Sequence, residues 1–201
     1  FVVPMIWPTS PNQTPTASFV YSPGSPTPAD EIYFIDTSAD NDGIMVAWYW
    51  DFGDGGTSTA QNPTHQYYSA GTYTVTRTVT DNGGAADNYS QSVHVNAPPT
   101  ASFTYFPSSP TTDNTIQFTD LSTDSDGTIT AWSWDFDNGA TSTSQNPSQQ
   151  YSSAGAYTVT LTITDNGGAT GSVSLTINVS NPPLDASFSY SPVSPTTADN
   201  V

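Results

Sequence analysis

The chain has 201 residues, no cysteine and a formal net charge of −17, because eighteen acidic residues are set against a single Lys or Arg. With one cation it cannot neutralise a phosphate backbone or an anionic lipid surface, which excludes nucleic acid and membrane-surface partners. The absence of cysteine excludes disulfides, thiolate metal sites and cysteine nucleophiles. No apolar run is long enough to span a bilayer, so we expect no membrane insertion in this segment.

One unit occurs twice, with an offset of 84 residues between Trp50 and Trp134. The string WYWDFGDG at 48–55 recurs as WSWDFDNG at 132–139, and Ala-Ser-Phe begins at 17, 101 and 186. A repeat at this period indicates a tandem array of one small domain. We therefore expect a leader or docking segment at 1–15, a domain at 16–96, a Pro-rich linker at 97–99, a domain at 100–180, a linker at 181–185 and the first strand of a further repeat at 186–201.

Within each unit, apolar residues alternate with Thr and Ser, a pattern typical of half-buried strands. In chain order, the first unit is predicted to form strands at 16–21, 31–37, 46–52, 57–59, 65–67, 72–80 and 88–96, separated by turns rich in Pro, Gly and Asn. Seven short antiparallel strands in roughly eighty residues predict an all-β fold, a tandem of immunoglobulin-like antiparallel β-sandwiches arranged head to tail.

One position breaks the inward apolar pattern. Leu161 is predicted to face the core of the second unit, whereas the equivalent residue of the first unit is Arg77. An Arg on an apolar face must extend to solvent or pair with an acid. We expect the strand that contains Arg77 to lie near the edge of its sheet.

The motif set resembles the PKD (polycystic kidney disease) domain. The resemblance rests on WDFGDG at 50–55, Asn62-Pro63, Tyr67, Ala70-Gly71, Tyr73-Thr-Val75 and VTDNGG at 79–84, and it covers nearly all of residues 16–180. It implies a non-catalytic, extracellular or cell-surface sandwich of the kind found in surface-layer and adhesion proteins and beside the catalytic domains of secreted hydrolases. Some bacterial members bind calcium. The second unit departs from the family at Asp137-Asn138, so we expect that turn to have a different shape.

Calcium is the predicted cofactor, because Asp-x-Asp-Gly occurs in the loop after the second strand of each unit, and the turn before the last strand should bring another Asp to the same end. Carboxylate and carbonyl oxygens are the ligands that calcium prefers. The alternative is that these Asp residues only form turns. The candidate metal ligands are Asp36, Asp40, Asp42 and Asp81 in the first unit and Asp120, Asp124, Asp126 and Asp165 in the second.

Catalysis is not expected, and no catalytic residue is proposed. His65 and His94 have no counterpart in the second unit, where Gln149 and Asn178 stand in their places. A glycosidase needs a pair of carboxylates, and Asp51 and Asp54 could form one. Because Asp54 is replaced by Asn138 in the second unit, we expect the pair to stabilise a turn instead.

The favoured function is a non-catalytic structural module, a rod-forming repeat of a cell-surface, sheath or filament protein that mediates spacing, assembly or adhesion. Its partners would be other copies of the protein or neighbouring repeats. The alternative is an accessory polysaccharide- or collagen-binding module of a secreted hydrolase, with Tyr49, Tyr68 and Tyr89 exposed for binding. Three Asn-x-Ser/Thr sequences permit glycosylation, at Asn12, Asn88 and Asn178.

Overall fold

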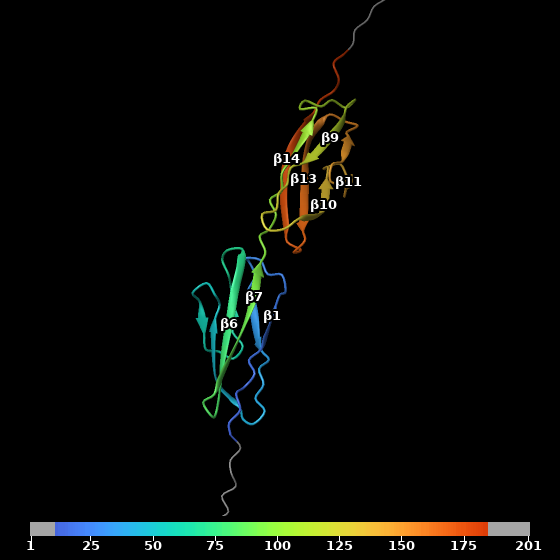
Figure 1. Ribbon diagram of the computed structural model, residues 1–201. Helices are drawn as coiled ribbons and strands as arrows, with labels where there is room; N and C mark the ends of the chain where they lie inside the picture. Colours follow the sequence, from blue (N-terminus) through green and yellow to red (C-terminus); the bar gives the residue numbers. More distant parts are fainter. Residues whose placement is uncertain (1–10, 185–201) are drawn as a thin grey trace, which may run out of the picture.

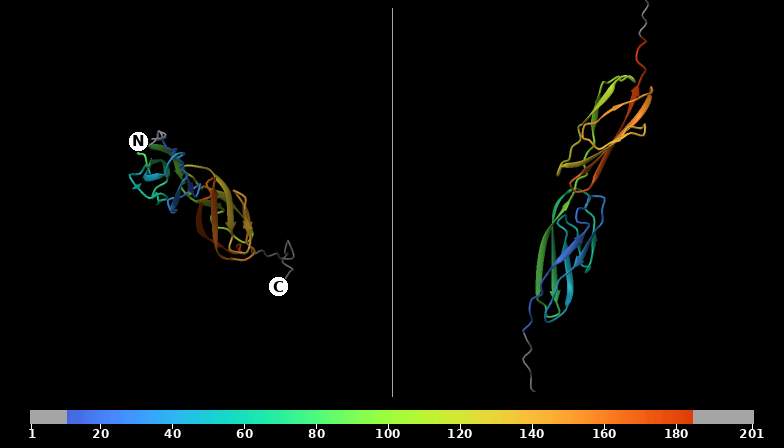
Figure 2. Two further views of the ribbon diagram at one scale, coloured as in Figure 1. Left: turned by 90° about the horizontal axis from the view of Figure 1, so that it is seen from below. Right: turned by 90° about the vertical axis from the view of Figure 1, so that its right-hand side faces the viewer.

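The computed structural model describes residues 11–184, which form two β-sandwiches joined end to end (Figure 1). Figure 2 shows the same end-to-end arrangement from two further sides. The predicted head-to-tail, all-β architecture is therefore confirmed. Within residues 11–184, no helix is long and apolar enough to cross a membrane. The predicted strand at 186–201 and residues 1–10 of the predicted leader lie outside the described residues.

Unit 1 consists of a three-stranded and a four-stranded antiparallel sheet. The first sheet has the order β1-β2-β5, and its strands are β1 (Phe19–Ser22), β2 (Ile32–Asp36) and β5 (Thr64–His65). The second has the order β4-β3-β6-β7, and its strands are β3 (Met45–Asp51), β4 (Thr57–Ser58), β6 (Gly71–Asp81) and β7 (Ala86–Val95). All seven predicted strands are present, with ends that differ by a few residues.

Unit 2 repeats this topology. One sheet has the order β12-β9-β8, formed by β8 (Phe103–Phe106), β9 (Thr115–Asp120) and β12 (Ser148–Gln150). The other has the order β11-β10-β13-β14, formed by β10 (Ile129–Asp135), β11 (Thr141–Ser142), β13 (Gly155–Asp165) and β14 (Thr170–Val179). Because both units share one strand order, each serves as an internal control for residues that only the other contains.

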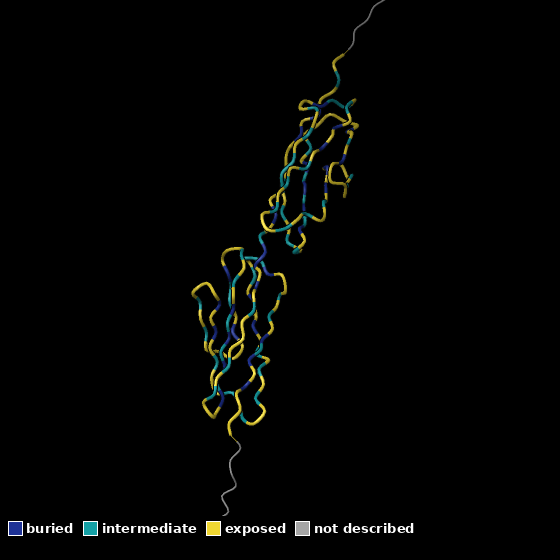
Figure 3. Tube along the Cα trace, in the orientation of Figure 1, coloured by how far each residue is buried: buried dark blue, intermediate teal, exposed yellow. Residues whose placement is uncertain are grey.

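The core of each unit forms between its sheets from the alternating inward residues of every strand (Figure 3). Trp50 and Trp134 are completely buried, and each packs against a Phe of the facing sheet. The hydroxyl groups of Tyr73 and Tyr157 donate to main-chain carbonyls four residues upstream, as in the tyrosine corner of immunoglobulin-like sandwiches. Burial of large aromatic rings compensates for the small share of aliphatic residues.

The expectation that the strand containing Arg77 lies at a sheet edge is wrong. β6 lies between β3 and β7, and Arg77 is completely buried. The guanidinium lies 5.1 Å from the ring centre of Trp50 and pairs with Asp36, so the expected acidic partner is confirmed. An interior strand can contain a buried cation here because β2 of the facing sheet supplies the opposite charge.

The turn at Asp137-Asn138 keeps the shape of its counterpart, contrary to expectation. Asp137 has a φ of 60°, and the equivalent Gly53 has a φ of 81°, so both occupy the left-handed region. The Oδ2 atom of Asp137 accepts a hydrogen bond from the main-chain N–H of Thr158 at 2.8 Å. This bond offsets the cost of a side chain in a conformation that favours glycine.

Candidate functional site

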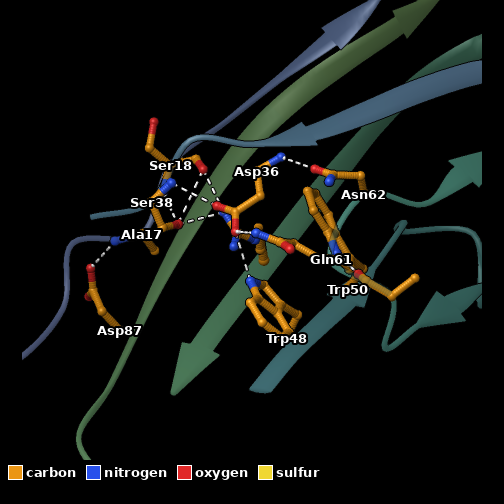
Figure 4. Close-up of polar contacts among 11 residues, drawn as sticks. Ala17, Ser18, Asp36, Ser38, Trp48, Trp50, Gln61, Asn62 and Asp87 are labelled. Atoms are coloured by element: carbon orange, nitrogen blue, oxygen red, sulfur yellow. Dashed lines mark hydrogen bonds and ion pairs between the residues drawn. The ribbon is translucent and has the colours of Figure 1, made fainter. Parts of the chain in front are cut away.

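The predicted metal ligand Asp36 lies at the centre of a buried polar network (Figure 4). Its Oδ2 atom accepts hydrogen bonds from Trp48 Nε1 at 2.7 Å and from Gln61 Nε2 at 3.0 Å. Its Oδ1 atom accepts from the main-chain N–H of Ser38 at 2.7 Å and pairs with Arg77 at 2.5 Å. Burial raises the pKa of Asp36, but these donors outweigh it and hold that pKa below its usual value.

Asp120 occupies the same place in unit 2 without a cation opposite, because Leu161 replaces Arg77. Its Oδ2 atom accepts from Trp132 Nε1 at 2.7 Å and from Gln145 Nε2 at 3.1 Å. Burial raises the pKa of Asp120, but its hydrogen bonds outweigh this effect, so the pKa lies below its usual value. The hydrogen bonds from Trp48 to Asp36 and from Trp132 to Asp120 thus connect the second and third strands in both units.

The loop after β2 in unit 1 and the loop after β9 in unit 2 contain a second pair of equivalent carboxylates, Asp40 and Asp124. The Oδ2 atom of each is buried and has no hydrogen-bond partner among residues 11–184. In unit 1 the Oδ2 atom of Asp40 lies beside Gly43. A Cβ atom added to Gly43 would be 2.7 Å from this oxygen and would also collide with the side-chain amide of Asn82. A buried carboxylate oxygen without a donor is costly, so it needs an explanation in each unit.

The turn before the last strand is organised by Asp81 in unit 1. The Oδ1 atom of Asp81 accepts the main-chain N–H groups of Gly83 and Ala85 at 2.8 and 2.9 Å. Its Oδ2 atom accepts from Asn12 Nδ2 at 2.9 Å. Burial raises the pKa of Asp81, but these hydrogen bonds outweigh it and leave the pKa below its usual value. Asp165 makes the same turn contacts in unit 2.

The joint between the units is held by hydrogen bonds to two carboxylates of unit 2, Asp126 and Asp165. Asn96 donates its main-chain N–H to Pro26 of unit 1 at 2.7 Å and its side-chain Nδ2 to Asp165 of unit 2 at 2.8 Å. The next residue, Ala97, donates its N–H to Asp126 Oδ2 at 2.9 Å. Asn96 is buried and therefore fastens one sandwich to the other.

The segment before unit 1 is held by the same two contacts, in which an Asn side chain and the next main-chain N–H each donate to an Asp. Asn12 donates to Asp81, and the N–H of Gln13 donates to Asp42 Oδ2 at 3.0 Å, with the 84-residue offset seen at the joint. From the sequence we expected Asn12 to lie in a leader and considered its side chain only as a permitted glycosylation site. The signal that could have found it is the matching Asn96. A glycan on Asn12 would break its bond to Asp81.

The structure thus brings three of the four candidate ligands of each unit to its N-terminal end, namely Asp40, Asp42 and Asp81, and Asp124, Asp126 and Asp165. Within residues 11–184, no group of three or more His, Cys, Asp or Glu side chains could by itself hold a metal ion. A cation at this end would need amide or carbonyl oxygens as well. An open cleft of about 560 Å³ adjoins this loop in unit 1 and is lined by Asp36, Asp40 and Trp48 among others.

The remaining polar groups form turns and local pairs. Asp51 and Asp54 each accept a main-chain N–H two residues further on, as expected for a turn. His65 contacts Asp54 at 2.8 Å and stacks on Phe52 with ring centres 4.1 Å apart, so its ring is largely covered. His94 is half exposed and lies 3.4 Å from Asp126 across the joint. These pairings are structural contacts, and they bring no nucleophile or proton donor to an open cleft within residues 11–184.

Comparison with known proteins decides the family. The PKD domain family matches residues 12–95 and 96–180, which together are most of the chain. The chain belongs to the PKD domain family. Both PKD domains are of the kind found in bacterial metalloproteases and collagenases.

Among curated proteins, the chain is 44% identical over 101 residues to a pre-pro-metalloprotease, PrtV, of Vibrio cholerae, a match that covers 48% of this chain and 11% of the relative. It is 42% identical over 77 residues to collagenase ColA of Bacillus cereus, covering 38% of this chain and 8% of the relative. The chain therefore spans about a tenth of the length of the curated relatives it matches. A solved structure, the PKD1 domain of Vibrio anguillarum Epp, is 36% identical with a TM-score of 0.40, covering 43% of this chain and 99% of that domain.

Proposed function

We propose that the two PKD domains are non-catalytic accessory modules of an extracellular protease, and that they bind its protein substrate. The observation that supports this most is the identity of more than 40% to a metalloprotease and to collagenases. The exposed tyrosines of unit 1 fit this role, since Tyr49, Tyr68 and Tyr89 are 47%, 84% and 40% exposed, as expected. Tyr is an amphipathic contact residue that is enriched at binding surfaces.

These relatives support the accessory role better than the sheath, filament or adhesion subunit that the sequence favoured. The end-to-end sandwiches would then hold the substrate at a set distance from a catalytic domain. Assembly into filaments and glycosylation remain predictions. Electron microscopy of the purified protein tests the filament, because isolated short rods would argue against it.

The accessory role is tested by binding of the two-domain protein to insoluble collagen, chitin and cellulose in parallel sedimentation assays. We expect retention on collagen and none on cellulose. Retention on a polysaccharide alone would assign the modules to a polysaccharide-active enzyme and overturn the protein-substrate role. Binding to none of the three would overturn the accessory binding role.

We also propose that each PKD domain binds one calcium ion at its N-terminal end. The buried Oδ2 atoms of Asp40 and Asp124 support this, because a cation would satisfy an oxygen that has no donor among residues 11–184. In unit 2 the residues that would hold calcium are Asp124, Asp126 and Asp165 with an amide or carbonyl oxygen from the joint. Asp36 is less suited, because it already pairs with the buried guanidinium of Arg77.

Calcium bound with a dissociation constant of about 10⁻⁴–10⁻³ M, at about millimolar calcium, would add roughly 0.4–1.4 kcal/mol per site. Thermal unfolding with calcium and then with EDTA measures this gain. Asp124→Asn should abolish the gain in unit 2, whereas Asp113→Asn, at an exposed position of the same unit, should leave it intact. A melting temperature that calcium does not change in the wild-type protein would refute the site.

A further inference from the structure

The outer face of the β1–β2 sheet in unit 1 bears a strip of exposed apolar side chains. Val20 of β1 pairs directly with Ile35 of β2, and Tyr33 lies two residues along the same face of β2. These side chains are 51%, 48% and 54% exposed, although their neighbours Phe19 and Phe34 are buried in the core. Cross-strand partners lie about 5 Å apart, and alternate residues of a strand about 7 Å apart. The strip is therefore continuous.

Unit 2 shows that the fold does not require this strip. The equivalent positions hold Thr104, Gln117 and Thr119, in the same register on β8 and β9. The sheet of unit 2 does expose Phe106 and Leu121, but the three polar residues separate them. Exposed apolar side chains that one copy of a domain has and the other replaces with polar ones are a mark of an interaction surface.

The charge beside the strip selects the partner. Glu31, the single Glu of the chain, precedes Tyr33 on the same face of the sheet and is exposed, and its Oε1 accepts a hydrogen bond from Thr64 at 2.8 Å. Unit 2 has Thr115 at this position. The single Arg of the chain, Arg77, is buried, so no Lys or Arg repels a cation at this surface. With a net charge of −17, the protein attracts cationic partners and repels acidic ones.

We propose that the strip formed by Val20, Tyr33 and Ile35, with Glu31 at its end, binds an extended polypeptide segment in which a Lys or Arg side chain stands next to apolar residues. The apolar side chains of the segment cover the strip, and its cation pairs with Glu31 and stacks against Tyr33. The inference rests on the proposed accessory role and identifies the region of a protein substrate that unit 1 binds. Because the strip is small, the contact is weak and works beside a tethered catalytic domain.

The test uses the two-domain protein and immobilised gelatin as an unfolded polypeptide. The triple variant Val20→Thr, Tyr33→Gln, Ile35→Thr installs the residues of unit 2, so the fold already accommodates them. We expect it to weaken gelatin binding at least fivefold, and Glu31→Thr to weaken it about twofold to fivefold. Val46→Thr, which also replaces an exposed apolar residue of unit 1 by the residue of unit 2, should change nothing. The reverse transplant into unit 2, Thr104→Val, Gln117→Tyr, Thr119→Ile, should strengthen binding.

Succinylated gelatin, in which the lysine ammonium groups are converted into carboxylates, should bind at least tenfold more weakly than gelatin. Equal binding of the wild-type protein and the triple variant would overturn the strip as the binding surface. Equal binding of gelatin and succinylated gelatin would overturn the cationic partner. If gelatin does not bind at all while insoluble collagen does, the inference fails and the accessory role stands. If neither binds, both fail.

Discussion

The buried ion pair between Arg77 and Asp36 should make unit 1 more sensitive than unit 2 to loss of one carboxylate. In Asp36→Asn, the guanidinium stays buried without its counter-charge, and its Nε and Nη2 groups already have no partner among residues 11–184. Removing one partner of a buried ion pair costs about 3–5 kcal/mol. In unit 2, Asp120→Asn leaves no buried cation without a partner. It only replaces hydrogen bonds to a charged carboxylate by weaker ones to a neutral amide, at a cost of about 1–2 kcal/mol in stability.

Both losses can be measured in one molecule by native-state hydrogen exchange with mass spectrometry, because peptides from β6 and β13 report on separate units. We expect the opening free energy of β6 to fall by about 3 kcal/mol or more in Asp36→Asn. At roughly 4–8 °C per kcal/mol for a domain of this size, that is a shift of about 15 °C in the melting of unit 1. Equal losses in the two variants would refute the reasoning.

Arg77→Leu is the control, since it installs the residue of unit 2. It removes the buried charge together with the two N–H groups that have no partner within residues 11–184, and it leaves Asp36 with the donors of Ser38, Trp48 and Gln61. Because Asp120 of unit 2 is held by equivalent donors with Leu161 in place of the cation, we expect a cost below about 2 kcal/mol, less than the roughly 3–5 kcal/mol of a buried charge left unpaired. A cost as large as that of Asp36→Asn would mean that the guanidinium matters through packing.

Three further outcomes are expected. The pKa of Asp36 in the folded protein is below its usual value of 3.8, because hydrogen bonds and Arg77 outweigh the effect of burial. The Asp36 carboxylate therefore stabilises unit 1 above pH 3.8, and this stabilisation is lost as the pH falls through the folded pKa. The melting temperature of unit 1 should fall more steeply below about pH 4 in the wild-type protein than in Asp36→Asn. Asp137→Ala should cost unit 2 about 1–2 kcal/mol in denaturant unfolding, because it keeps the left-handed conformation and loses the bond to Thr158, whereas Asp137→Gly should be nearly neutral. Asn96→Ala should broaden the interdomain distances in X-ray scattering, since it removes the bond to Asp165. An unchanged distribution would show that Asn96 does not hold the two units together.

The fold could be predicted from local pattern, because a strand with one buried face repeats every two residues whatever it packs against. Val75 and Val79 face inward as this period requires, and Trp50 is the buried Trp of the third strand. The family could be recognised for a similar reason, since the WDFGDG string combines core rings with a turn that needs glycine. The two copies strengthened both predictions, because a residue that recurs at the same offset has the same structural role in each unit.

The candidate site was only partly predictable. The Asp residues of the loops were found because their spacing is local, but their partners were not, since Asn12 and Asn96 reach carboxylates 69 residues away in the sequence. The surroundings of Asp36 could not be predicted for a related reason. Its position in the loop motif suggested a ligand, whereas Trp48 and Arg77 hold it in the polar network between the sheets.

The sequence by itself determined that this protein is a tandem of PKD domains with a dense negative charge and exposed tyrosines in one unit, because composition, period and motif are properties of the chain. Only the tertiary structure decided where the charges and apolar side chains meet. It put Arg77 on an interior strand opposite Asp36, and it aligned Val20 with Ile35 on one open face. Strand order and register depend on pairing between distant segments, which no local pattern specifies.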